Sequence, residues 1–234
     1  MSLEKIITSA WDRDSRWLVF LIPLSWFFSV LSGFRRQYMQ GKYQGSAYAA
    51  PVIIIGNISV GGSGKTPLII ALVAALKQRG YSPGVVSRGY SGQAVNYPLS
   101  VTSSTAVNDS GDEPLLIATL ADCPVVVDPN RPAAVEYLLS HFDCDLVLSD
   151  DGLQHYALHR DIEVVVVDGQ RGLGNGRILP AGPLREGAQR LDQADFVVIN
   201  GKRADTGRDA LSDNPVGEMA IQPTGFRHLQ SGRR

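Results

Sequence analysis

The chain has 234 residues, of which 22 are lysine or arginine and 23 are aspartate or glutamate, so its formal net charge is 22 − 23 = −1. This balance argues against a protein held on nucleic acid by bulk charge, and no nucleic-acid partner is expected. Hydrophobic residues make up 44% and charged residues 19%, which excludes an intrinsically disordered chain. Two cysteines without CxxC spacing, Cys123 and Cys144, indicate neither a disulfide framework nor a zinc site.

The first unusual feature is an uncharged apolar stretch from Trp17 to Phe34, with arginines on both sides. As a helix it would be about 27 Å long, slightly shorter than the hydrocarbon layer of a bilayer, and Pro23 is expected to kink it near its middle. Two membrane interpretations stay open: the stretch crosses the bilayer as a short anchor, or it lies in the interface with its aromatic residues inserted. The alternative is a buried helix of a soluble core. We expect residues 1–48 to form a membrane-associated segment.

Beyond residue 48, short runs rich in β-branched residues alternate with stretches of helical length. Amphipathic patterns over 67–79 and 132–141 predict helices. Continuously apolar strands are typical of a parallel sheet covered on both faces, so the sequence predicts a doubly wound α/β fold for residues 49–200. The alternation of strand and helix patterns stops at residue 200, and residues 201–234 are expected to form a linker. The predicted strands are 51–56, 84–87, 124–128, 146–150, 164–168 and 196–200.

A glycine-rich loop separates the first predicted strand from the first predicted helix. In a P-loop, glycines let backbone N–H groups turn toward phosphate, and the following helix adds its positive end. Ser59 stands where the pattern has its first glycine, but Gly-Lys-Thr and the strand-loop-helix context are kept. Lys65 is expected to act on the β- and γ-phosphates, and the Thr66 hydroxyl to hold Mg²⁺. The predicted nucleotide-binding residues are Ser59, Val60, Gly61, Gly62, Ser63, Gly64, Lys65 and Thr66.

A P-loop also needs a carboxylate that orients the metal at the end of a neighbouring parallel strand. Asp150 and Asp151 follow one predicted strand and are the candidates, although an exposed acidic turn is the alternative. Asp168 ends the next strand and competes for the same task. The Asn-Lys-x-Asp motif that reads guanine is not found after the strand that ends at Asn200, so ATP is favoured over GTP.

Five motifs follow one another along the chain. They are Gly-Asn with Gly-Gly-Ser-Gly-Lys-Thr-Pro within 56–67, Val-Ser-Arg-Gly-Tyr at 86–90, Gly-Asp-Glu-Pro at 111–114, Ser-Asp-Asp-Gly-Leu-Gln-His at 149–155 and Leu-Pro-Ala-Gly-Pro-Leu-Arg-Glu at 179–186. Together they resemble the successive motifs of the tetraacyldisaccharide 4′-kinase family. The resemblance extends from the apolar N-terminal stretch to about Gly201.

This resemblance implies transfer of the γ-phosphate of ATP, with Mg²⁺, to the 4′-hydroxyl of tetraacyldisaccharide 1-phosphate. The product would be the 1,4′-bisphosphate of the lipid A pathway in Gram-negative bacteria. The family also implies a location at the cytoplasmic face of the inner membrane, because the lipid substrate stays in the bilayer. No protein partner is indicated.

The resemblance assigns a catalytic role to Asp112, which matches the family's carboxylate that accepts or orients the proton of the attacking hydroxyl. Without the family, Asp112 is more simply a helix cap before Pro114. Arginine suits phosphate because its fork donates two hydrogen bonds. The substrate-binding residues that the resemblance implies are Arg131, Asn175, Arg185 and Glu186, and His155 is expected to be structural and not a metal ligand.

Family members continue into a smaller C-terminal part with an Ala-Gly-Ile-Gly-type stretch and an Asp-His motif, whose histidine pairs with the catalytic aspartate. His228 lacks that context. We therefore expect residues 201–234 to lead toward a second domain that is absent, and transfer to be impaired by about 10²–10⁴-fold where the acid-base partner is missing. Two other functions stay open: a non-catalytic protein that binds ATP or membrane, and a different P-loop ATPase.

Overall fold

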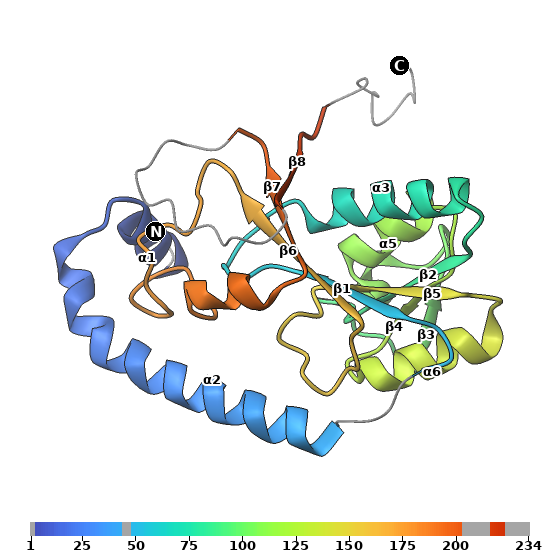
Figure 1. Cartoon of the computed structure of the whole chain (residues 1–234), viewed down its shortest axis with the longest axis horizontal. Coiled ribbons are helices and arrows are strands. Elements are labelled where there is room, and N and C mark those ends of the chain that lie inside the picture. The colour runs from blue at the N-terminus through green and yellow to red at the C-terminus, as the bar shows by residue number, and fades with distance from the viewer. Residues whose placement is uncertain (1–2, 44–47, 203–215, 223–234) are drawn as a thin grey trace.

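The computed structural model describes residues 3–43, 48–202 and 216–222. Its centre is a sheet of eight strands in the order β3-β4-β2-β5-β1-β6-β7-β8 (Figure 1). Neighbouring strands are parallel except for β3, which is antiparallel to β4. The strands are β1 (Val52–Gly56), β2 (Pro83–Ser87), β3 (Leu99–Val101), β4 (Val125–Val127), β5 (Leu146–Asp150), β6 (Ile162–Asp168), β7 (Phe196–Asn200) and β8 (Val216–Met219).

Helices cover both faces of the sheet, which confirms the predicted doubly wound fold. On one face, α3 (Lys65–Gln78) and α5 (Asp112–Leu120) contribute Ile69, Val73 and Ile117 to one buried cluster. On the other face, α6 (Arg131–His141) contributes its apolar side to a second cluster. The central strands β1 and β5 carry apolar side chains on both faces of the sheet, because helices cover both faces. Two short helices, α4 (Val107–Ser110) and the 3₁₀ helix η2 (Ala188–Gln193), complete this part.

All six predicted strands are present, and two further strands were not predicted. β3 has three residues and lies at the sheet edge, where a short strand leaves little periodic signal. β8 falls inside residues 201–234, where the sequence predicts a linker, and it pairs in parallel with β7 through Val197 and Val216. The linker prediction is therefore wrong for these four residues. Residues 203–215 and 223–234, including His228, lie outside the described part of the chain.

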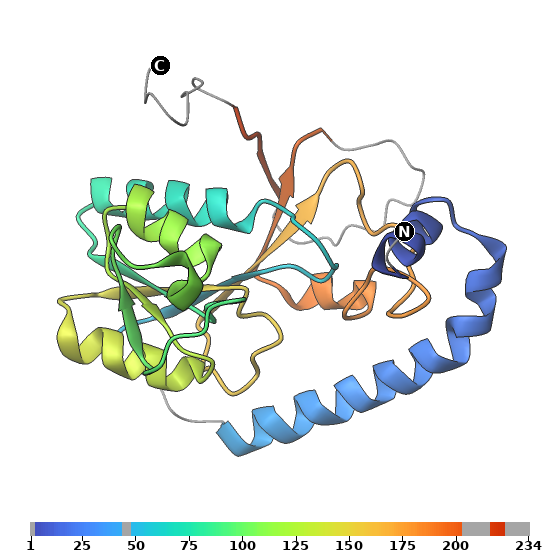
Figure 2. The same ribbon diagram turned by 180° about the vertical axis from the view of Figure 1, so that it is seen from behind.

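The N-terminal segment forms α1 (Leu3–Asp12), the 3₁₀ helix η1 (Arg16–Leu21) and α2 (Ile22–Tyr43). The predicted kink at Pro23 is wrong, because α2 begins at Ile22 and the proline occupies its first turn, where a missing N–H leaves no hydrogen bond unmade. Helix α2 runs along the outside of the molecule (Figures 1 and 2). Within Arg16–Met39, which includes η1 and most of α2, only 11% of the most apolar stretch is buried, which argues against a core helix.

Candidate active site

The strand order brings the glycine-rich loop and the acidic pair together at the carboxyl ends of two neighbouring central strands, β1 and β5. β5 lies beside β1 in parallel, with Ile55 opposite Asp150, so the segments that follow both strands emerge together. Lys65 begins α3 directly after the loop and is buried despite its charge. Its Nζ lies 3.4 Å from Asp151 Oδ1 and donates to Asn57 Oδ1 at 3.3 Å. A buried ammonium beside a carboxylate, at the start of a helix, is the arrangement of a phosphate-binding site.

Asp150 is fully buried and only partly hydrogen-bonded. Its Oδ2 accepts a hydrogen bond from Ser87 Oγ at 3.4 Å, whereas Oδ1 has no partner among the residues that the structure describes. Burial raises the pKa of Asp150 to about 6, with Glu113 adding to the shift and Lys65 opposing it. An unpaired buried carboxylate oxygen is costly unless it meets a cation or a donor. Oxygen is the ligand that Mg²⁺ prefers, so this donor fits the ion.

Asp151 has a different environment from its neighbour. It adopts the left-handed backbone conformation, with φ of 49°, and its carboxylate pairs with Lys65 and with Arg185, whose Nη1 lies 3.2 Å from Asp151 Oδ2. Burial alone would raise the pKa of Asp151, but Lys65 and Arg185 lower it overall. Asp151 is therefore ionised at neutral pH and is not the exposed acidic turn that the sequence left open.

Arg131 lies beside the acidic pair and is almost completely buried at the start of α6. Its Nη2 donates to the backbone oxygen of Asp150 at 2.7 Å, while Nε and Nη1 have no partner within the described part of the chain. Burial lowers its pKa to about 10, against the opposing effect of Asp150 and Asp151, so the guanidinium stays charged at neutral pH. The structure thus brings this predicted substrate residue next to the predicted metal ligand.

Glu186 holds together a polar network beside Arg185. Its Oε1 accepts Gln154 Nε2 at 2.9 Å, and its Oε2 accepts the Tyr156 hydroxyl at 2.6 Å. Arg36 of α2 reaches the same carboxylate at 3.9 Å and lies 5.5 Å from the centre of the Tyr156 ring. Gln154 in turn accepts from Arg185 Nη1 at 3.3 Å. The network therefore links the N-terminal helix to the residues around Asp151.

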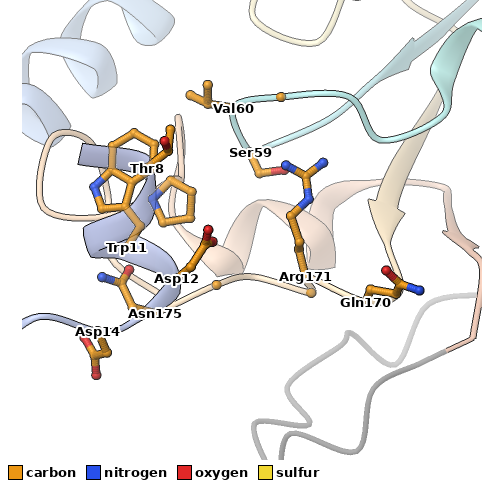
Figure 3. Close-up of a pocket in the computed structure, with 13 residues that line it drawn as sticks. Thr8, Trp11, Asp12, Asp14, Ser59, Val60, Gln170, Arg171 and Asn175 are labelled. Atoms are coloured by element: carbon orange, nitrogen blue, oxygen red, sulfur yellow. The ribbon is translucent and has the colours of Figure 1, made fainter. Parts of the chain in front are cut away.

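Asn175 is placed away from the acidic pair. Its amide donates to the Ala181 oxygen at 3.0 Å and accepts the backbone N–H of Arg177 at 3.1 Å, so both ends serve the loop after β6. It lines a cavity of about 460 Å³ together with Trp11 and the beginning of the glycine-rich loop (Figure 3). Asp168, the competing carboxylate, is occupied by hydrogen bonds from the backbone and side chain of Arg171. The geometry favours Asp150, whose Oδ1 has no partner in the described part of the chain, over Asp168 for a metal.

Asp112 is exposed at the first residue of α5, where its Oδ1 accepts the backbone N–H of Glu113 at 3.0 Å. This contact joins neighbouring residues within the first turn and is not a helix cap, because the N-cap of α5 is Gly111. Glu113 is the α5 carboxylate that adds to the raised pKa of Asp150. His155 is neutral at pH 7, because burial, followed by Arg131 and other arginines, lowers its pKa to about 4. No cluster of three His, Cys, Asp or Glu side chains suited to a metal occurs in the described ranges.

The sequence analysis gave no separate role to Asn57 or Gln154. Asn57 contacts Lys65 directly, and Gln154 bridges Arg185 and Glu186 while donating to the Asn57 oxygen at 3.1 Å. The available signal was position: each is a polar residue directly beside a motif that follows a strand or opens a helix.

A family model described as tetraacyldisaccharide-1-P 4′-kinase matches residues 17–234. The chain belongs to this family. Among curated members, the tetraacyldisaccharide 4′-kinase of Shewanella baltica is 48% identical over 225 residues, which cover 95% of this chain and 63% of that protein. The tetraacyldisaccharide 4′-kinase of Hahella chejuensis is 49% identical over 209 residues, covering 87% and 62%. The chain thus spans less than two thirds of the length of these family members.

A solved structure of a family member resembles this one. The crystal structure of LpxK from Aquifex aeolicus in complex with ATP matches with a TM-score of 0.72 and 28% sequence identity. The match covers 86% of this chain and 64% of the Aquifex chain. This similarity places the α/β core described above within the kinase family's fold.

Proposed function

We propose that this chain transfers the γ-phosphate of ATP to the 4′-hydroxyl of tetraacyldisaccharide 1-phosphate, giving the 1,4′-bisphosphate. The observation that carries the proposal is the convergence of buried Lys65 with Asp150 and Asp151 at the carboxyl edge of the sheet. The ATP complex of the Aquifex relative supports ATP as the phosphate donor. Family membership supports the lipid acceptor.

In this proposal the loop from Ser59 to Thr66 surrounds the phosphates and Lys65 places positive charge on the group in transfer. The residues proposed to hold Mg²⁺ are Thr66, Asp150 and Asp151. Among their oxygen atoms, Oδ1 of Asp150 is the best candidate ligand because it is buried and has no partner in the described part of the chain. Mg²⁺, when bound, neutralises charge on the phosphate oxygens. Asp151 also keeps Lys65 and Arg185 in place through its two ion pairs.

The acceptor hydroxyl needs a group that takes its proton, and Asp112 is proposed for this task. The hydroxyl proton passes to the carboxylate as the sugar oxygen bonds to the γ-phosphorus, and the bond from that phosphorus to the β,γ-bridging oxygen breaks to release ADP. Arg131 and Arg185 are proposed to bind the disaccharide or its 1-phosphate, since both guanidinium groups lie beside the acidic pair. Glu186 is proposed to shape this side of the site, and Asn175 is proposed to bind substrate from the cavity that it lines with Trp11.

We further propose that α2 lies in the inner-membrane interface, at the cytoplasmic face, and does not cross the bilayer. Ser25, near its beginning, donates to the Ile178 oxygen at 2.8 Å and accepts the Ala181 N–H at 3.0 Å. Arg36, further along, donates to Gln193 Oε1 at 2.5 Å. A helix attached to the polar body at two points along its length cannot have lipid all around it. The outer side of η1 and α2 is apolar, with Phe20 of η1 and Trp26, Phe27, Leu31 and Phe34 of α2 exposed.

This arrangement fits the proposed substrate. A tetraacylated lipid stays in the membrane, so the kinase has to approach it from the membrane surface. Residues 1–48 are accordingly proposed as the membrane-associated part and residues 49–200 as the catalytic core, to which β8 adds an edge strand.

The test is a transfer assay with the full chain in detergent, Mg²⁺, ATP labelled at the γ-phosphate and tetraacyldisaccharide 1-phosphate. We expect label in the lipid, none with Lys65→Ala, and wild-type transfer with Lys77→Ala. Lys77 is a matched control because it lies at the other end of the same helix and pairs with Asp122 on the surface. ATP binding without labelled lipid would contradict the proposal, as would ATP hydrolysis that is independent of the lipid.

A further inference from the structure

Three consecutive backbone oxygens of the glycine-rich loop each accept a hydrogen bond from a side chain. Asn57 Nδ2 donates to the Gly61 oxygen at 3.2 Å. Arg171 Nη2 donates to the oxygen of the next residue, Gly62. Asn200 Nδ2 donates to the oxygen of Ser63 at 3.1 Å. We call these three donors, Asn57, Arg171 and Asn200, the carbonyl brace.

The brace donors are themselves held by the sheet. Arg171 follows β6, and Asp168 at the end of that strand accepts its backbone N–H at 3.0 Å and its Nε at 3.1 Å. Partial burial would raise the pKa of Asp168, but the hydrogen bonds from Arg171 lower it overall. Figure 3 shows the Arg171 side chain extending from this loop toward Ser59. Asn200 is the last residue of β7, one strand further along the sheet.

Two glycines of the loop make this close approach possible. A Cβ at Gly64 would lie 2.4 Å from Asn200 Nδ2, and a Cβ at Gly61 would lie 2.8 Å from Arg171 Nη1. Both glycines also have positive φ values, of 94° and 101°. The loop therefore needs glycine at these positions both for its backbone path and for contact with the brace.

Peptide geometry connects the brace to anion binding. Because a trans peptide is planar, the carbonyl of one residue and the N–H of the next point in opposite directions. Donors that hold the Gly61, Gly62 and Ser63 oxygens therefore also fix the directions of the following three N–H groups. Successive N–H groups that share a direction form an anion-binding concavity.

We propose that Arg171 and Asn200 are positioning residues that keep the glycine-rich loop in its phosphate-binding conformation before the nucleotide arrives. A loop that is ordered in advance does not lose conformational entropy on binding, so the brace increases affinity for the polyphosphate without touching it. This inference rests on the proposed nucleotide function. Asn57 belongs to the brace by geometry, but it also contacts Lys65, so it does not serve as a test.

The experiment measures the dissociation constant of Mg-ATP by calorimetry on the full chain, with thermal unfolding followed in parallel. Asn200→Leu keeps the side-chain size, removes the donor and adds no charge, and we expect about fivefold weaker binding. Arg171→Ala removes a charged donor, and we expect at least about tenfold weaker binding, with partial recovery in Arg171→Lys. The KM for ATP should rise in both variants with little change in kcat, because the brace acts before chemistry.

Arg177→Ala is the matched control, because Arg177 lies in the same loop and pairs with Asp14 at 3.5 Å instead of contacting the glycine-rich loop. Wild-type affinity in folded Asn200→Leu, or an equal loss of affinity in Arg177→Ala, would overturn the brace while leaving the proposed kinase function intact. If Asn200→Leu does not fold, Asn200→Ala removes the same donor with a smaller change. A wild-type chain that binds no ATP would overturn the proposed function and the brace together.

Discussion

Two regions of the molecule leave opposite kinds of groups without partners. Around Asp150, at the carboxyl ends of the central strands, the groups are polar atoms, and on the outer side of η1 and α2 they are apolar side chains. At the carboxyl ends of the central strands, three buried oxygen atoms have no hydrogen-bond partner in the described structure: Asp150 Oδ1, Ser63 Oγ and Ser149 Oγ. On η1 and α2, aromatic side chains are exposed, with Phe20 of η1 at 82% and Trp26 of α2 at 71%. Folding alone stabilises neither arrangement, since buried polar atoms need partners and apolar surface favours leaving water. The two regions therefore agree with the proposed ligands, a nucleotide with its metal ion at the first and a lipid surface at the second.

The two regions are joined by polar contacts. From α2, Arg36 reaches Glu186, Glu186 holds Gln154, and Gln154 contacts Arg185, which pairs with Asp151. Under the proposed function, these contacts would keep the membrane-facing helix and the phosphate site in a constant relation to each other.

The largest effect is expected at Asp150. Asp150→Asn keeps the volume and removes the buried charge, so transfer should fall by about 10²–10³-fold in the labelled-lipid assay. Without Mg²⁺ or nucleotide, the variant should unfold at a temperature at least as high as the wild type at pH 7, because it no longer buries an unpaired carboxylate.

Asp151→Asn provides the contrast for that variant. Its carboxylate pairs with Lys65 and Arg185, which lower its pKa, so the ionised form contributes stability above the unfolded-state pKa and loses it as the pH falls. Removing this charge should lower the unfolding temperature. A lower unfolding temperature for Asp150→Asn than for Asp151→Asn would contradict the assignment of the two environments.

The next largest effect is expected on the outer side of η1 and α2. Replacing both Phe20 and Trp26 by glutamine should weaken binding to vesicles of anionic phospholipid by about 10²-fold, since each exposed aromatic side chain gains roughly 1.5–3 kcal/mol on leaving water. Sedimentation with vesicles measures this, and ATP affinity is the control that should not change. Undiminished vesicle binding would show that another surface faces the membrane.

A smaller effect is expected in the middle of the network. Arg36→Ala removes the contacts to Glu186, Gln193 and Tyr156, and we expect KM for the lipid to rise about three- to fivefold with vesicle binding retained. Arg36→Lys keeps the charge for lipid headgroups but lacks the fork, so it should restore only part of the effect. If the lysine variant behaves as wild type, headgroup attraction and not the network explains the role of Arg36.

The smallest effect is expected on pH stability. The pKa of His155 is lowered to about 4 by burial and by neighbouring arginines, so the folded state favours the neutral ring. The stability this contributes is present above the unfolded-state pKa of about 6.5 and is lost as the pH falls toward 4, by roughly 1–2 kcal/mol for a partly exposed ring. Denaturant unfolding at pH 7 and pH 5 should show a smaller difference in His155→Gln than in the wild type.

Most of the fold was predictable because parallel strands buried on both faces leave unbroken apolar runs in the sequence. β1 and β5 are examples, and the turn chemistry around Lys65 identified the phosphate loop. β3 and β8 were missed because short edge strands are stabilised by their neighbours and not by their own pattern. Pro23 was misjudged because the position of a helix start depends on the 3₁₀ turn before it.

The sequence by itself determined the residue types of the site and the order of the elements that carry them, since these are local properties of the chain. Only the tertiary structure decided which carboxylate stays unpaired and which is held, because Asp150 and Asp151 are neighbours in sequence but face different partners. The same holds for Arg171 and Asn200, which lie far from the glycine-rich loop along the chain. They meet it because parallel strands bring their carboxyl ends to one edge, where residues distant in sequence share a single site.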